Sequence, residues 1–129
     1  MNGLPGARLR RVTEFIDDNL ARALPLAELS AEAHMSQYHF ARLFKESTGL
    51  PPHRFVVQRR IARACALLLE GNLSIDAIAR AVGFRTRSHF SMVFHRHTGS
   101  PPTVYRAFAG LRKSNGDVHD QAGEDRQMM

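Results

Sequence analysis

"GFRTRSHFSMVFHRHTGSPPTVY" occupies residues 83–105, and "HMSQYHFARLFKESTGLPPHRF" occupies residues 34–55. The two stretches match at an offset of 50 residues, because aromatic, glycine and proline residues recur at the same places. The recurring residues of the first stretch are Ser36, His39, Phe40, Phe44, Thr48, Gly49, Pro51 and Pro52. In the second stretch a threonine, Thr86, takes the place of Ser36. This short chain therefore contains one small structural unit twice.

The spacing of apolar residues, together with the glycine, proline and capping residues between the apolar segments, predicts an all-α protein. Apolar residues recur at intervals of three and four, and strand-like alternation is absent from the sequence. Gly49 and Gly99 each stand where a helix ends in a left-handed residue, and a proline pair then starts the next helix. Ser36 and Thr86 are suitable N-caps. About seven helices are expected, at residues 7–22, 26–33, 37–47, 52–70, 75–82, 87–97 and 102–109.

A further set of apolar residues precedes each stretch. At an offset of 49 residues, Leu26 and Leu29 match Ile75 and Ile78. The change from 49 to 50 places one extra residue, Arg85, in the turn of the second unit. Each unit is therefore predicted to be a short helix, a tight turn and a second helix.

The second helix of each unit has one apolar face and one polar face. Phe40 and Phe44 in the first unit, like Phe90 and Phe94 in the second, form a stripe with helical spacing that predicts burial. The outward residues differ between the units and are Tyr38, Ala41, Arg42 and Lys45 in one and Ser88, Ser91, Met92 and His95 in the other. One scaffold is thus used twice to present two surfaces. A helix-turn-helix with a polar, partly basic outward face fits the major groove of B-DNA.

A long basic helix, expected at residues 52–70, joins the two units. Its apolar residues, among them Val57 and Ile61, lie in line for packing, while Arg59 and Arg60 are expected mostly elsewhere on its surface. Its length of about 27 Å, with the adjoining turns, would hold two reading helices about one DNA turn, roughly 34 Å, apart.

The charge distribution favours a polyanionic partner. The net charge is +6, and the isoelectric point is near 10.7. Residues 1–112 hold 16 Lys and Arg against 8 Asp and Glu, whereas residues 113–129 hold 2 against 4. A compact basic body favours nucleic acid first and a membrane surface second, although a basic protein without such a partner remains an alternative.

Other classes of function find little support in the sequence. The lone Cys65 cannot form an intramolecular disulfide, and the apolar run 65–69 is too short to span a membrane. His95 and His97 diverge on a helix, so we expect no metal site. The sequence contains no phosphate-binding glycine loop, nucleophile elbow or zinc-protease motif, so neither a cofactor nor enzymatic activity is expected. The N-terminus lacks an apolar signal core, which indicates a cytoplasmic protein.

Residues 60–105 resemble the signature of the AraC/XylS family of bacterial transcription regulators. The matching elements are Arg60-Ile61, Leu67-Leu68, Ile75-x-x-Ile78-Ala79, Val82-Gly83-Phe84, Ser88-x-Phe90, Phe94 and Gly99-x-x-Pro102. With the upstream repeat, the resemblance covers about residues 7–110 and implies helix-turn-helix subdomains at 24–51 and 73–101, joined by the linker helix at 52–70. Residues 111–129 are expected to form a flexible, mildly acidic tail, because the end of the chain lacks apolar periodicity. Most relatives carry a separate sensing or dimerising domain. This chain looks like the small stand-alone activators of the family, or like a DNA-binding half alone.

The resemblance also implies which residues contact DNA. The base-contacting positions fall on Gln37, Tyr38, Ala41 and Arg42 in the first unit and on Arg87, Ser88, Ser91 and Met92 in the second. The phosphate-contacting positions are expected at Ser36, Lys45, Arg85, Thr86, Arg96 and Arg106. Arg42 is the strongest candidate, because an arginine can bind guanine with two hydrogen bonds, with a non-specific phosphate contact as the alternative. Gln37 could read adenine or lie in solvent, and Tyr38 could pack on a thymine methyl group or be half-buried.

Three residues depart from the family pattern. Relatives usually have a basic residue at Met92 and often lysine at His95, so the second unit is electrostatically weaker. They often have glycine at His34. If the turn is left-handed there, His34 pays about 1 kcal/mol.

The expected function is therefore a sequence-specific regulator of transcription that binds double-stranded DNA. We expect an activator that binds a promoter site of about 20 base pairs as a monomer and contacts RNA polymerase, in the cytoplasm at the nucleoid and not at a membrane. The alternative is an adaptor that binds RNA polymerase or another regulator without reading DNA.

Overall fold

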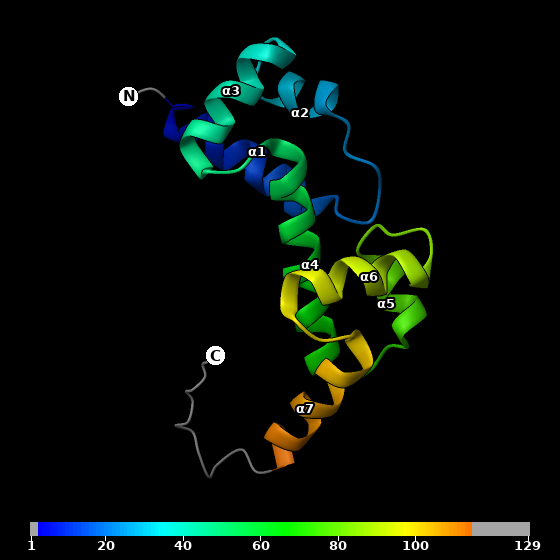
Figure 1. Ribbon diagram of the computed structural model, residues 1–129. Coiled ribbons are helices and arrows are strands. Elements are labelled where there is room, and N and C mark those ends of the chain that lie inside the picture. Colours follow the sequence, from blue (N-terminus) through cyan, green and yellow to red (C-terminus); the bar gives the residue numbers. More distant parts are fainter. Residues whose placement is uncertain (1–2, 115–129) are drawn as a thin grey trace.

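The computed structural model describes residues 3–114, which form helices joined by short loops (Figure 1). No strand occurs in this range, so the predicted all-α fold is confirmed. None of its helices is both long and apolar enough to cross a membrane. The helices are α1 (Gly6–Asp18), α2 (Leu26–Glu32), α3 (Gln37–Thr48), α4 (Pro52–Glu70), α5 (Ile75–Ala81), α6 (Arg87–Thr98) and α7 (Pro102–Ser114).

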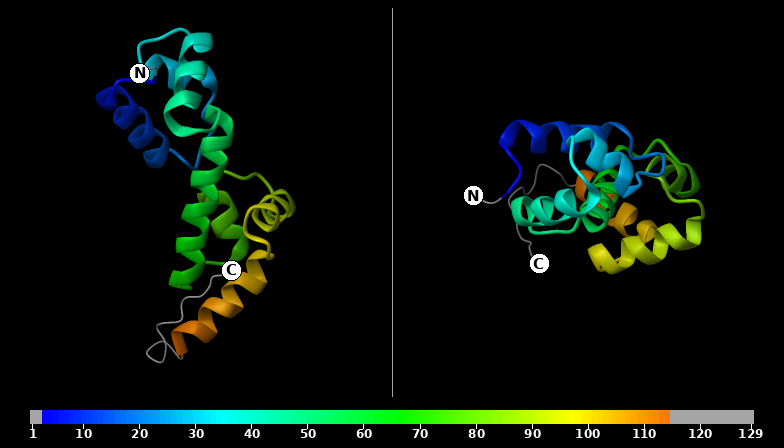
Figure 2. Two further views of the ribbon diagram at one scale, coloured as in Figure 1. Left: turned by 60° about the vertical axis from the view of Figure 1, so that its left-hand side comes forward. Right: turned by 90° about the horizontal axis from the view of Figure 1, so that it is seen from above.

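The helices gather at the two ends of α4. Figure 2 shows α1, α2 and α3 around one end and α5, α6 and α7 around the other. Each group has its own apolar core, and α4 contributes Val56 to the first core and Ile61, Ala64, Leu67 and Leu68 to the second. α4 is therefore the shared element on which two small helix-turn-helix subdomains are built.

The same local contacts begin and end the second helix of each subdomain. The Ser36 hydroxyl accepts a hydrogen bond from the His39 backbone N–H at 3.3 Å, and Thr86 accepts one from His89 at 3.1 Å. At the other end of each second helix, Gly49 and Gly99 have φ values of 85° and 88°. These are the left-handed C-terminal residues and N-caps that the repeat predicts.

α1 is shorter than the sequence predicts. It ends at Asp18 rather than at residue 22. The Asn19 side chain donates a hydrogen bond to the Phe15 carbonyl at 2.8 Å, and Leu20 turns inward to become buried. Arg22 then donates to both carboxylate oxygens of Glu28 at 3.0 and 2.6 Å, and these bonds lower the pKa of Glu28. Residues 19–25 are therefore an ordered connection, whose position is fixed by contacts that helical periodicity cannot reveal.

α7 is longer than predicted and continues from residue 109 to Ser114. Ala109 is buried, and Gly110 does not end the helix because no proline or capping residue follows it before Ser114. The first four residues of the tail predicted at 111–129 are thus helical. The remainder of that tail, residues 115–129, lies outside the described residues.

The two subdomains touch beside the middle of α4. Gly83, in the turn between α5 and α6, has a φ of 92°. A Cβ atom at this position would lie 2.4 Å from the Leu20 carbonyl oxygen and 2.8 Å from the Arg60 guanidinium carbon. Arg60 also donates a hydrogen bond to the Arg22 carbonyl at 2.7 Å. The loop 19–25 of one subdomain therefore packs against α4 and against the turn of the other subdomain.

His34 takes the corresponding place in the first turn, with a φ of 58°. The turn is therefore left-handed, and the histidine carries the conformational cost that the sequence suggests. His34 is exposed, and its Nε2 atom lies 3.2 Å from Nη1 of Arg11. A side chain is accommodated here because this turn faces solvent, whereas the turn at Gly83 faces a backbone carbonyl.

Comparing Gly83→Ala with Gly99→Ala distinguishes the effect of the close contact at Gly83 from the effect of a left-handed backbone. Both glycines have a left-handed φ, but a Cβ at Gly99 would have no atom within 4 Å. We expect Gly99→Ala to lower the free energy of unfolding by about 1–2 kcal/mol. Gly83→Ala should cost about 1–3 kcal/mol more, because Leu20 and Arg60 must move. Urea unfolding measures both values, and equal losses would show that the contact at Gly83 contributes nothing.

Candidate nucleic-acid interface

The outward face of α3 is open to solvent. Tyr38 is 80% exposed, Gln37 and Arg42 are exposed, and Ala41 is half-buried between them. On the opposite side of the helix, Phe40 and Phe44 are fully buried. The exposure of Tyr38 is inconsistent with the half-buried alternative. The scaffold thus fixes α3 through its aromatic residues and leaves the predicted base-contacting residues accessible.

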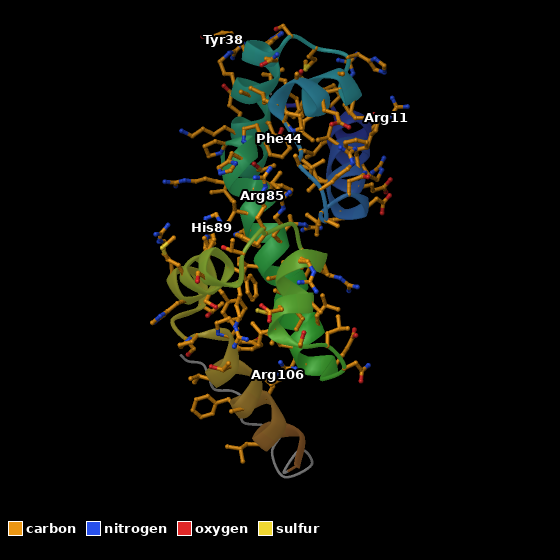
Figure 3. All side chains as sticks on the ribbon, turned by 90° about the vertical axis from the view of Figure 1, so that its right-hand side faces the viewer. Arg11, Tyr38, Phe44, Arg85, His89 and Arg106 are labelled. Atoms are coloured by element: carbon orange, nitrogen blue, oxygen red, sulfur yellow. The ribbon has the colours of Figure 1, made fainter. Side chains whose placement is uncertain are left out.

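α6 is held in the same way and presents different side chains. Phe90, Val93 and Phe94 are buried, while Arg87 and Ser88 are exposed, Ser91 is half-buried and Met92 is 51% exposed. The predicted base-contacting residues of the second unit are therefore accessible too. In Figure 3, Tyr38 of α3 and His89 of α6 project toward one side of the view and Arg11 toward the other.

Each unit contains one arginine that is loosely paired with a carboxylate. Nη1 of Arg42 lies 3.5 Å from Glu46, four residues later on α3, and Nη1 of Arg87 lies 3.8 Å from Asp76 on α5. Both arginine side chains are 49% exposed. Exposed pairs at such distances contribute little in water, about 0–1 kcal/mol. Arg42 and Arg87 can therefore exchange these carboxylates for another acceptor at small cost.

The predicted phosphate-contacting residues fall into two groups. Ser36 and Thr86 are exposed, and their hydroxyl groups cap the second helix of each unit. Lys45, Arg85 and Arg96 are exposed, and no carboxylate of residues 3–114 lies within ion-pair distance of them. These three cations are available to an external anion.

Arg106 lies apart from the other predicted phosphate contacts. It stands on α7, and its guanidinium donates a hydrogen bond to the Leu73 carbonyl at 2.7 Å. Figure 3 shows it at the start of α7, away from Tyr38 and His89. Arg106 thus ties α7 to the loop between α4 and α5.

Two arginines of the linker helix have structural roles that were not predicted from the sequence. Arg59 is hydrogen-bonded to Asp17 of α1, which raises the pKa of Arg59, and its guanidinium lies 5.5 Å from the centre of the Phe55 ring. Arg60 is half-buried, and burial lowers its pKa. Arg60 follows Val56 and Val57 by four and three positions, so helical spacing already places it beside the apolar face of α4.

A family model described as a helix-turn-helix domain matches residues 29–107. The chain belongs to the AraC/XylS family of transcription regulators. It is 34% identical over 97 residues to the probable transcriptional regulator LumQ of Photobacterium leiognathi, an alignment that covers 75% of this chain and 39% of LumQ. This AraC-family chain spans 32% and 33% of the length of two further curated relatives.

Solved structures of AraC-type DNA-binding domains share its fold. The DNA-binding domain of AdpA, in complex with a target DNA, superposes with a TM-score of 0.79 at 31% identity, covering 84% of this chain and 98% of that one. A DNA-binding transcriptional dual regulator from Escherichia coli K-12 gives a TM-score of 0.76 at 27% identity, with 87% and 100% coverage. The chain therefore has the fold of an AraC-type DNA-binding domain.

Arg106→Gln should lower stability without changing the salt dependence of DNA binding, whereas Arg96→Gln should change that salt dependence with little effect on stability. Arg106→Gln removes the hydrogen bond to Leu73, so we expect a loss of about 1 kcal/mol in the free energy of unfolding and an unchanged salt dependence of DNA binding. Arg96→Gln removes an exposed cation, so the free energy of unfolding should change by less than about 0.5 kcal/mol. The plot of log K against log salt should become less steep, its slope decreasing in magnitude by about 0.9. A smaller salt slope for Arg106→Gln would instead show that Arg106 contacts phosphate, as the sequence predicts.

Proposed function

We propose that this AraC-family chain reads two successive major-groove segments of a promoter, one with α3 and one with α6, as a transcription activator. The observation that carries the proposal is the repeated scaffold: buried aromatic residues fix both helices, and both outward faces are exposed and different in sequence. α4 has 19 residues and rises about 27 Å from its first residue to its last, which with the adjoining turns fits two reading helices one DNA turn apart. The AdpA domain, bound to its target DNA, gives the same fold a precedent.

The two reading helices are proposed to contribute unequally. Arg42 is suited to the two acceptors of guanine, and Gln37 to adenine. On α6, Arg87 is the residue suited to a bidentate contact, while Ser88 and Ser91 can bond to several bases and Met92 makes only apolar contact. Most sequence preference should therefore lie in the half-site bound by α3.

A single chain is proposed to occupy an asymmetric site of about 20 base pairs, because both reading helices are already present in one molecule. The proposed activator would bind at the nucleoid and contact RNA polymerase there. A protein-interaction module that does not read DNA is the second candidate. It is favoured by one observation, the 64% exposure of Phe108 on α7, because large exposed apolar side chains are common in protein contacts.

The test begins with selection of preferred sites from random duplex DNA by the purified chain. A base-substitution scan of the selected site then compares the unmodified chain with Arg42→Ala. We expect the substitution to cost about 1–3 kcal/mol on the selected site, to relax the preference at one or two base pairs and to spare random DNA. Binding should also weaken by orders of magnitude between low and near-physiological salt.

Met92→Ala is the matched control, because Met92 stands at the position of Arg42 in the second unit and should change the scan little. Equal weakening on selected and random DNA would reduce Arg42 to a phosphate contact. A flat salt dependence with no selected sequence would favour the protein-interaction module. A complex with the mass of two chains per site would contradict monomeric binding.

A further inference from the structure

Arg60 stands on α4 where the two apolar cores meet. α4 contributes Val56 to the first core and Ile61 to the second, so Arg60 lies between the two contributions. In Figure 1 the loop between α1 and α2 lies beside the turn between α5 and α6, next to α4. Arg60 therefore borders both subdomains from a position on the helix that they share.

The guanidinium of Arg60 contacts a backbone segment of each subdomain. On the side of the first subdomain, Nη2 donates a hydrogen bond to the Arg22 carbonyl at 2.7 Å. On the side of the second, the guanidinium packs so closely on Gly83 that a Cβ atom there would lie 2.9 Å from Nε. Because a hydrogen bond has a preferred direction, these contacts restrict how the two subdomains turn relative to each other about α4.

Short connections link both backbone segments to the outward-facing helices. The Arg22 side chain donates hydrogen bonds to Glu28 of α2, and α2 packs against α3. On the other side, Thr86 caps α6 only three residues after Gly83. A displacement of the Arg60 guanidinium would therefore reach α3 in one direction and α6 in the other within a few residues.

Stability alone does not account for an arginine at this position. The Nε atom of Arg60 has no accessible surface and no hydrogen-bond partner within residues 3–114. A buried, charged donor without an acceptor destabilises a fold. An unbranched apolar side chain such as methionine would fill much of the same space without an unpaired donor. The preceding residue, Arg59, differs because its guanidinium is hydrogen-bonded to Asp17.

We propose that Arg60 is a positioning residue that sets the orientation of α6 relative to α3 and thereby determines which spacing of half-sites the chain accepts. The proposal rests on the proposed function, because it takes α3 and α6 to be the reading helices. Each subdomain has its own core, so each helix keeps its own surface when Arg60 is changed. The joint binding of two half-sites changes instead, because it depends on how narrowly the connection holds both reading helices.

The first experiment compares Arg60→Met with the unmodified chain on three kinds of DNA. These are the selected site, DNAs that keep only one half-site, and sites with one to five base pairs inserted between the halves. Affinity for a single half-site should change by less than about threefold, and affinity for the selected site should fall by about tenfold. The loss caused by the first inserted base pair should shrink from at least about tenfold to about threefold or less. The midpoint of urea unfolding should stay unchanged or rise.

Arg59→Met is the matched control, because it removes the same charge from the adjoining residue of α4, whose partner Asp17 belongs to the first subdomain. It should keep the steep loss at the first insertion even if its urea midpoint falls. Gly83→Ala displaces the Arg60 guanidinium from the other side, so it should weaken the spacing preference as Arg60→Met does. Gly99→Ala, where a Cβ atom meets nothing within 4 Å, should not.

Distances between two spin labels test the orientation without DNA. The labels are attached to Glu46→Cys on α3 and His95→Cys on α6, both exposed positions, in a Cys65→Ala background that removes the single native cysteine. The distance distribution should be narrow with Arg60 present, narrow in Arg59→Met and broader in Arg60→Met. An equally narrow distribution in Arg60→Met, or an unchanged spacing preference, would overturn the role of Arg60. If the unmodified chain selects no sequence, the proposed function fails, and the label distances alone decide whether Arg60 orients α6.

Discussion

The close approach of the Gly83 turn to the Leu20 carbonyl is the constraint on which the arrangement of the two subdomains depends. Each subdomain has its own core, so α4 alone would leave their relative rotation to the stiffness of one helix. The contact of Gly83 with Leu20, together with the hydrogen bond from Arg60 to the Arg22 carbonyl, adds a second connection. The ordered loop 19–25 therefore serves as a brace between the subdomains, and α3 and α6 inherit a fixed spacing from it.

In this arrangement the cationic side chains fall into groups with different surroundings. Arg59, Arg60 and Arg106 are engaged within the protein and hold α1, the loop 19–25 and the loop before α5 in place. Arg42 and Arg87 are half-exposed and only loosely paired, so they can turn toward base edges. Lys45, Arg85 and Arg96 are exposed without a carboxylate partner among residues 3–114, so they remain available to an anion. Some of the cations that give the net charge of +6 thus hold the fold, and the others are those that the proposed function assigns to base and phosphate contacts.

Much of the fold could be predicted from the sequence, because its determinants are local. Gly49, Gly99 and the proline pairs after them mark where helices end and begin, and Ser36 and Thr86 cap them as expected. The exposed positions of α3 and α6 also followed from helical spacing. The early end of α1 could not be predicted, because it depends on Leu20 packing against a turn some sixty residues away. The partners of Arg60 and Arg106 are likewise 38 and 33 residues distant. The sequence repeat therefore predicts the two helix-turn-helix units, whereas the way in which they pack together is seen only in the tertiary contacts of the structure.

The spacing between the two half-sites tests the central claim most directly. Base pairs are inserted one at a time between the halves of the selected site, and the affinity of the unmodified chain is measured for each DNA. Because each base pair adds about 3.4 Å and a DNA turn has about 10 base pairs, a braced pair of reading helices should lose affinity at the first insertion. By half a turn, binding should fall to the level of one half-site alone. Equal affinity across all spacings would contradict the account, since it would mean that the two helices are not held together or that only one of them reads DNA.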